Sequence, residues 1–148
     1  MAQTTGGITF RGCKIEISTN GTNWTDISGW FNKIEVGGGE RNIGEFFTAD
    51  GDTPILGAGK RAALELTVAV VYTEGGGDPF SVLLTAFESA GPLYVRWSPK
   101  GGAAGQNMYT TSAGYVTTPV YPGGEVEPGD LIPVEFTHKV ATITKSVV

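Results

Sequence analysis

The chain has few of the residues on which most metal proteins and disulfide-bonded proteins depend. It contains one cysteine and one histidine among 148 residues. Cys13 therefore has no partner for an intrachain disulfide, and His138 cannot belong to a multi-histidine metal site. Charged residues make up 17% of the chain, below the usual ~25%. We expect no enzyme, no metal and no cofactor.

Basic residues and long apolar runs are also scarce. The chain has 10 basic against 15 acidic residues and a net charge of −5, the opposite of the balance with which proteins neutralise phosphates. The longest apolar run, 64–72, contains Glu65 and Thr67 and is too short to cross a bilayer. Residues 1–7 show no secretion signal. We expect a soluble protein made in a reducing cytoplasm, without a membrane partner.

Glycine is abundant instead, with 23 of 148 residues, about twice the usual ~7%. A chain rich in glycine and threonine and poor in charge favours many short strands and turns over helices. The length fits one domain, 1–148.

Alternating apolar and polar residues predict the strands. The pattern is clearest over 62–73, where Leu64, Leu66, Val68, Val70 and Tyr72 share one face. Further strands are expected at 13–18, 23–28, 93–98, 108–120 and 132–136, the last continuing into 141–145. Asn20-Gly21 predicts that a tight type I′ turn joins the first two of these into a hairpin.

One helix is predicted over about 78–90. Asp78 suits the N-cap and Pro79 the first helical position. Apolar residues follow at helical spacing, and Gly91-Pro92 ends the helix.

The segment 29–60 is a long excursion of glycine-rich, partly extended chain. A structureless loop of this length is improbable inside a compact domain, so neighbouring copies are the simplest cover for it. It carries two aromatic pairs, Trp30-Phe31 and Phe46-Phe47. Adjacent side chains of an extended strand point to opposite sides, so one member of each pair should leave the domain core. We predict that these four aromatics form a subunit interface.

Together these elements predict a mostly β, α+β domain, most simply a β-sandwich or open barrel with one flanking helix. No catalytic arrangement emerges from them. Residues 57–62 match a dinucleotide motif, but the strand follows the glycines instead of preceding them. Asp50 and Asp52 favour a polar turn over a calcium loop. His138 is interpreted as a packed histidine and Cys13 as an inert strand residue, although a pairing of the two is not excluded by the sequence.

Several short motifs occur in a characteristic order along the chain. They are Trp24-Thr25-Asp26-Ile27-Ser28-Gly29-Trp30, Gly38-Gly39-Glu40-Arg41, Asp50-Gly51-Asp52-Thr53-Pro54-Ile55, Gly59-Lys60-Arg61, Val71-Tyr72-Thr73-Glu74 and Trp97-Ser98-Pro99-Lys100-Gly101. In this order they resemble the tail tube (major tail) proteins of long-tailed bacteriophages and prophages. The motifs cover about half of the chain, and the element order covers nearly all of it.

The resemblance implies a β-sandwich of tail-tube type that closes into rings, typically hexameric, which stack into a hollow tube. The 29–60 excursion would be the loop or hairpin that reaches the next ring. Residues 1–11 and 144–148 would be arms that order on assembly, and no Ig-like domain is expected after them. The implied partners are further copies of the chain and the tape measure, tail terminator and distal tail proteins. The implied location is the virion, after synthesis in the cytoplasm of the host bacterium.

The resemblance also places double-stranded DNA in the lumen, where it passes without specific binding. An acidic wall fits this role, because repelled phosphates slide instead of adhering. The candidate lumen residues lie on the polar faces of two strands: Glu65, Thr67 and Thr73 on the first, and Glu135 and Thr137 on the second.

Two other functions stay open at this point. The chain could be a carbohydrate- or surface-binding β-sandwich with Trp24, Trp30 and Trp97 as stacking platforms. It could also be a capsid-decoration or tail-terminator protein, which forms one closed ring and no filament.

Overall fold

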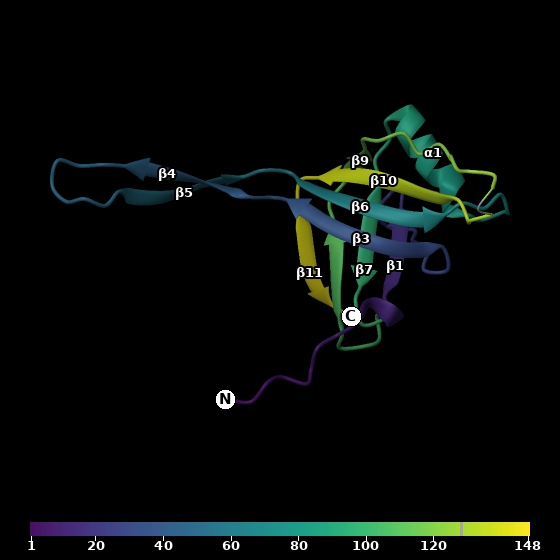
Figure 1. Cartoon of the computed structure of the whole chain (residues 1–148), viewed down its shortest axis with the longest axis horizontal. Coiled ribbons are helices and arrows are strands. Elements are labelled where there is room, and N and C mark those ends of the chain that lie inside the picture. The colour runs from purple at the N-terminus through teal and green to yellow at the C-terminus, as the bar shows by residue number, and fades with distance from the viewer. Residues whose placement is uncertain (128) are drawn as a thin grey trace.

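The computed structural model describes residues 1–127 and 129–148. In it, two antiparallel sheets face each other, and a two-stranded ribbon extends from one side (Figure 1). The first sheet has five strands in the order β11 (Ile143–Val147), β8 (Asn107–Thr111), β7 (Tyr94–Ser98), β1 (Lys14–Ser18) and β2 (Thr25–Asp26). The second has four, in the order β3 (Phe31–Gly38), β6 (Leu64–Val71), β10 (Pro133–Val140) and β9 (Gly114–Val116). The mostly β sandwich predicted from the sequence is confirmed.

The core lies between the two sheets and follows the alternation in the sequence. Every second residue of each central strand is buried, because successive side chains of a strand point to opposite faces. The buried residues include Ile15 and Ile17 of β1, Val95 and Trp97 of β7, Leu66, Val68 and Val70 of β6, and Val134 and Phe136 of β10.

The predicted helix is α1 (Pro79–Ser89), which lies against β9. Leu83 and Ala86 face the core, and Phe80, Leu84 and Phe87 are half-buried. The helix ends before Gly91, because Ala90 adopts the left-handed conformation with φ 54°. Within residues 1–127 and 129–148, no helix combines the length and apolar character that crossing a bilayer requires.

The first hairpin forms as expected, but its turn differs from the type I′ prediction. β1 pairs with β2 through Ile17↔Thr25 and Glu16↔Asp26, one residue out of the register that a two-residue Asn20-Gly21 turn requires. The Asn20 side chain accepts hydrogen bonds from the N–H groups of Thr22 and Asn23, both at 2.9 Å. This side-chain bonding stabilises a longer loop in place of the tight turn.

The ribbon is formed by β4 (Arg41–Phe46) and β5 (Ile55–Arg61), which pair only with each other among the described strands. The chain enters it through Gly38 and Gly39, whose φ angles of 70° and 73° suit glycine. A Cβ on Gly38 would lie 2.7 Å from the carbonyl oxygen of Ala63, so the two chains cross closely there. We call residues 39–63 the hairpin. It is shorter than the 29–60 segment expected from the sequence, because β3 pairs with β6 inside the sandwich.

The two ends of the chain differ. Within the segment 144–148, which was expected to order only on assembly, residues 144–147 belong to the five-stranded sheet, since β11 pairs with β8 from Ile143↔Thr111 to Val147↔Asn107. That prediction is wrong, because the last residues continue the extended pattern and find a free sheet edge. Residues 1–9 are exposed and lead away from the body, and the 3-10 turn η1 (Phe10–Gly12) follows them (Figure 1). Their ordering on assembly stays a prediction.

Candidate assembly surfaces

The hairpin carries large apolar side chains that the rest of the chain does not cover. Phe46 is 69% exposed and Phe47 62%. Ile43, Ile55 and Leu56 are also more than half exposed. We call these five residues the hairpin strip. An isolated two-stranded hairpin is marginally stable in water, and large apolar side chains left exposed together mark a contact surface. The hairpin therefore presents a surface that is suited to contact with another molecule.

Cross-strand register places this apolar surface on both faces of the hairpin. Phe46 lies opposite Ile55, whereas Glu45 lies opposite Leu56 and Ile43 opposite Ala58. Phe46 and Ile55 thus share one face, and Ile43 and Leu56 share the other. A partner that covers only one face would leave apolar side chains in water on the other.

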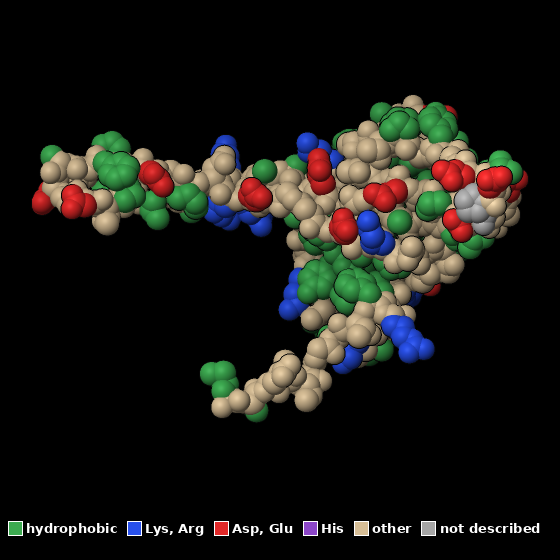
Figure 2. Space-filling view, in the orientation of Figure 1, with side chains coloured by type: hydrophobic (Ala, Val, Ile, Leu, Met, Phe, Trp, Pro, Cys, Tyr) green, Lys and Arg blue, Asp and Glu red, His purple; other side chains and the backbone are tan. Residues whose placement is uncertain are grey.

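Three basic residues surround the base of the hairpin. Arg41 pairs directly across from Arg61, and Lys60 is adjacent. Like charges in opposed cross-strand positions are destabilising. The Arg41 guanidinium donates a hydrogen bond of 2.8 Å to the carbonyl oxygen of Gly59, but none of the three makes an ion pair with a described residue. Figure 2 shows the basic groups in the part of the ribbon nearer the body, with an acidic side chain beside them, and green apolar and red acidic groups farther out toward the tip.

The aromatic pair Trp30-Phe31 behaves differently from Phe46-Phe47. Both Trp30 and Phe31 are half-buried against the core, and the Trp30 indole N–H donates to Thr73 Oγ1 at 2.9 Å. We expected one member of each pair to leave the core, and this expectation is wrong for both pairs. Trp30 and Phe31 both stay at the core, whereas Phe46 and Phe47 are both exposed. Trp30 and Phe31 also line a groove of 410 Å³ with Val71, Leu131 and Pro133, so part of each aromatic is accessible from outside.

Four of the five predicted lumen residues share one sheet face. Thr67 of β6 lies opposite Thr137 of β10, and Glu65 and Glu135 occupy the flanking rows. Strand β3 completes these rows with Lys33, Glu35 and Gly37. Glu35 and the two lysines, Lys33 and Lys139, were missed from the sequence, because their rows depend on pairing between distant strands.

This sheet face is more balanced in charge than the sequence-based prediction implied. It holds Glu35, Glu65 and Glu135 against Lys33 and Lys139. The Lys33 ammonium lies 3.5 Å from a Glu35 carboxylate oxygen and 4.0 Å from one of Glu135. These pairs are exposed and therefore weak. In Figure 2, acidic and basic groups lie side by side over β3, β6 and β10.

Thr73 does not join this face. Strand β6 ends at Val71, and the Thr73 hydroxyl accepts from Trp30 while donating 3.4 Å to an Asp78 carboxylate oxygen at the helix start. Its place among lumen residues is corrected: Thr73 connects the edge of the sandwich to α1.

The described residues do not gather into a reactive centre. His138 is fully buried, and its Nε2–H donates 2.8 Å to the carbonyl oxygen of Leu93. Cys13 Sγ is 3.7 Å from the carbonyl oxygen of Lys14, and burial raises the pKa of this thiol. The two side chains thus have separate partners. No three His, Cys, Asp or Glu residues in 1–127 and 129–148 form a metal-sized cluster. Residues 57–61 form most of β5, so the apparent dinucleotide motif lies in a ribbon strand.

The tryptophans do not form a sugar-stacking platform. Trp97 is buried and stacks on Tyr109 with ring centroids 5.7 Å apart. Trp30 is held at the core by Thr73. The Arg96 guanidinium carbon lies 4.2 Å from the centroid of Trp24 and covers that ring.

No family model and no curated protein sequence matches this chain. Solved structures do match over nearly its full length. A chain in the sheath-tube complex of an extracellular contractile injection system (PVC), in its extended state, is 13% identical in sequence to this chain. The TM-score is 0.73, and the alignment covers 99% of this chain and 100% of that one. The SPP1 tail tube is 14% identical, with a TM-score of 0.73 and coverage of 96% and 80%. The chain has the tail-tube fold.

A third match is to the tube terminating cap of the anti-feeding prophage, at 13% identity, a TM-score of 0.65 and coverage of 100% and 95%. The tail-tube fold therefore occurs in tubes and in the caps that end them. The similarity to tail tube proteins expected from the motif order is confirmed at the level of fold, and all three matches are to components of larger assemblies and not to enzymes.

Proposed function

We propose that this chain is the repeating subunit of a hollow tail tube in a phage or phage-like virion, made in the cytoplasm of the host bacterium. The observation that carries the proposal is the hairpin, which exposes five large apolar side chains away from the body of a chain with the tail-tube fold. Burying one Phe side chain contributes about 1.5–3 kcal/mol. Because every copy carries the same hairpin, such contacts repeat around each ring junction.

The subunits form closed rings, hexameric as the resemblance implies, which stack without limit. A ring is a closed heterologous contact, and its repetition along an axis is an open one. Strand β3 supports lateral closure, because it is an eight-residue edge strand whose outer backbone groups pair with no described strand. Unprotected edges of this length favour pairing with another chain. The tape measure, tail terminator and distal tail proteins are the further partners.

The sheet face of Glu65, Thr67, Glu135 and Thr137 lines the lumen in this proposal. Three carboxylates against two ammonium groups give the face a small negative charge in each copy, and the whole chain carries −5. Double-stranded DNA then passes without adhering, because a repulsive wall offers no phosphate contacts.

Electron microscopy of the purified chain tests the proposal directly. At high concentration, or after seeding with tube fragments, we expect hollow filaments of uniform diameter built from stacked rings, and image averaging gives the ring number. A monodisperse monomer at millimolar concentration in the presence of seeds would contradict the proposal.

A tail terminator or cap is the second candidate, favoured by the match to a tube terminating cap. A terminator ends a tube, so it forms a single ring that does not extend. Isolated rings without filaments, which bind to the end of an existing tube, would support this function over the first. Rings that bind to capsids instead would indicate a decoration protein.

A further inference from the structure

The hairpin strip needs a receiving surface, and the body of the molecule offers one at its other end. The loop 121–131, of which the structure describes 121–127 and 129–131, projects from the end of the body opposite the hairpin (Figure 1). Val126 is 97% exposed and Leu131 81%. These side chains are apolar and uncovered, as those of the hairpin strip are.

Two adjoining grooves follow this loop. One is the 410 Å³ groove lined by Trp30, Phe31, Val71, Leu131 and Pro133. The other, of 330 Å³, is lined by Gly123, Gly124, Glu125, Asp130, Leu131 and Pro133. Leu131 and Pro133 line both, so the two grooves adjoin, one lined mainly by apolar side chains and the other bordered by acidic ones. We call the two together the loop groove.

The charges of the two surfaces are complementary. The loop carries Glu125, Glu127 and Asp130, and none of them makes an ion pair with a described residue. The base of the hairpin carries three cations, of which Arg41 and Arg61 oppose each other across the ribbon. A facing set of carboxylates relieves that repulsion. Figure 2 shows the acidic groups at the end of the body and the basic groups at the base of the ribbon.

On the hairpin and in the loop groove alike, a charged region lies next to an apolar region. On the hairpin, Phe46 lies five residues along the extended chain from Arg41, roughly 17 Å away. In the loop groove, the acidic part adjoins the apolar part lined by Trp30 and Phe31. A hairpin whose base lies against the carboxylates therefore extends its strip along the apolar part. Within one chain the two surfaces lie at opposite ends (Figure 2), so a second copy must supply the partner.

We propose that the hairpin of one copy docks in the loop groove of a second copy. Arg41, Lys60 and Arg61 face Glu125, Glu127 and Asp130, and Phe46 packs toward Trp30 and Phe31. This inference rests on the proposed function and assigns the receiving surface of the contact between copies. The contact is head-to-tail, the type that propagates without closing.

Reciprocal charge reversal tests the contact. The hairpin variant is Arg41→Glu, Lys60→Glu and Arg61→Glu, and the loop variant is Glu125→Lys, Glu127→Lys and Asp130→Lys. Each should raise the minimum concentration for tube growth roughly ten-fold or more, because like charges then face each other. The chain that carries all six changes should grow within about three-fold of the wild-type concentration, since the pairs form again with reversed sign.

A matched control distinguishes the effect of pairing between the two charged surfaces from the effect of the net charge of the chain. The hairpin variant combined with Glu65→Lys, Glu74→Lys and Glu135→Lys gains the same positive charge as the loop variant, but at exposed sites outside the loop groove, and we expect no restored growth. Growth restored equally by this control, or no restoration in the chain with six changes, would overturn the proposal. Normal growth of both triple variants would overturn it too. These results all presuppose wild-type tubes, whose absence would instead refute the proposed function.

Cross-linking gives an independent measurement in assembled tubes. In a Cys13→Ser background, Asn42→Cys beside the hairpin base and Gly123→Cys in the loop should be joined by a short bismaleimide into a ladder of linked chains. A Cβ at Gly123 would meet no atom within 4 Å, so the variant should fold. Asn42→Cys paired with Thr22→Cys is the control and should give no ladder. Tubes in which the Asn42–Gly123 pair also gives none would contradict the docking.

Discussion

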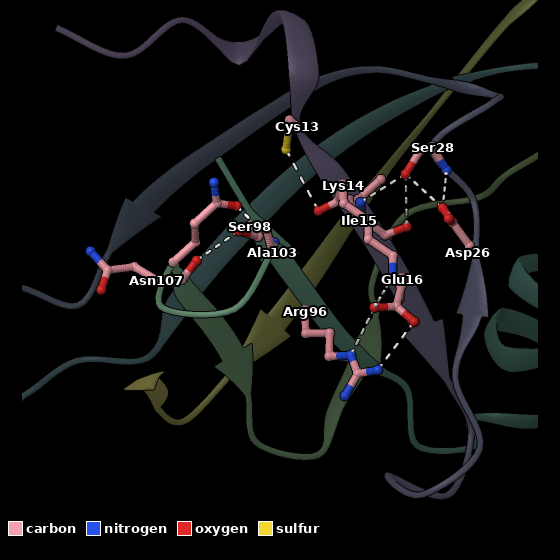
Figure 3. A network of polar contacts seen from close by, with 11 residues as sticks. Cys13, Lys14, Ile15, Glu16, Asp26, Ser28, Arg96, Ser98, Ala103 and Asn107 are labelled. Carbon is pink, nitrogen blue, oxygen red and sulfur yellow. Dashed lines mark hydrogen bonds and ion pairs between the residues drawn. The ribbon is translucent and has the colours of Figure 1, made fainter. Parts of the chain in front are cut away.

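The Arg96 guanidinium holds the Glu16 carboxylate through two hydrogen bonds, each 3.1 Å long, from Nε to Oε1 and from Nη2 to Oε2 (Figure 3). The two residues face each other across β7 and β1. Glu16 is only 7% exposed, and the Lys14 ammonium lies 3.6 Å from Oε1. A carboxylate removed from water in this way is stable only while its partners satisfy it.

Replacing Arg96 with Ala should therefore destabilise the fold by about 3 kcal/mol, near the lower limit for breaking a buried pair because Lys14 remains. The double variant Arg96→Ala, Glu16→Gln should lose less, since no buried charge is left unpaired. Chemical denaturation of the monomer measures both. Equal losses in the single and double variants would show that the charge of Glu16 is not the cause.

Changing Phe46 and Phe47 to Ser should abolish tube growth and leave the melting temperature of the monomer nearly unchanged. Both side chains are mostly exposed in the single chain, so their removal costs the monomer little. Phe136→Ala is the matched control, because Phe136 is fully buried and its loss costs about 3–5 kcal/mol. Thermal unfolding and electron microscopy give the two readouts. A melting temperature lowered by many degrees in the Phe46/Phe47 variant would place these residues in the core.

Changing Glu65 and Glu135 to Lys should leave tubes intact and make them bind DNA, with binding that weakens as salt rises. Both residues lie on the exposed sheet face, and Lys33 retains Glu35 when Glu135 is replaced. The change repeats in every subunit of a ring, which multiplies its effect. Glu74→Lys with Glu88→Lys makes the same change of charge on another surface and serves as control. Intact tubes of the first variant that bind no DNA would place the two glutamates outside the lumen.

His138 should make the stability of the fold depend on pH. Burial lowers the pKa of His138 below its ordinary value near 6.5, so the unfolded chain binds a proton at pH values where the folded chain does not. The neutral side chain thus contributes its full stability above about pH 6.5, and this contribution is lost as the pH falls below that value toward the folded pKa. His138→Gln keeps a donor for Leu93 but does not titrate. Its melting temperature should fall less than that of the wild type between pH 7.5 and pH 5. An equal fall in the melting temperatures of the variant and the wild type would contradict the assignment of this pH dependence to His138.

Elements whose signal is local could be predicted from the sequence. The alternation over 62–73 predicted β6, and helical spacing after Asp78 predicted α1, because each pattern reports one buried face of one element. The presence of Asn20 did not by itself determine the type of turn. Its side chain can bond to the backbone in several turns, and the loop that formed has a different register from the one Asn-Gly favours.

Which surfaces remain exposed depends on how distant segments pack together. Trp30-Phe31 and Phe46-Phe47 are equivalent aromatic pairs in the sequence, but β3 has β6 as a neighbour and a core beneath it, whereas β4 pairs only with β5. Thr73 and Thr67 likewise share the same parity, and only the position where β6 ends separates them.

The clusters of charged residues could not be predicted from the sequence for the same reason. Arg41 and Arg61 lie far apart in the chain and meet through the register of the ribbon, while Glu35, Glu65 and Lys139 come together through the pairing of three strands. Burial and charge proximity depend on pairing between distant segments, which a local pattern does not specify.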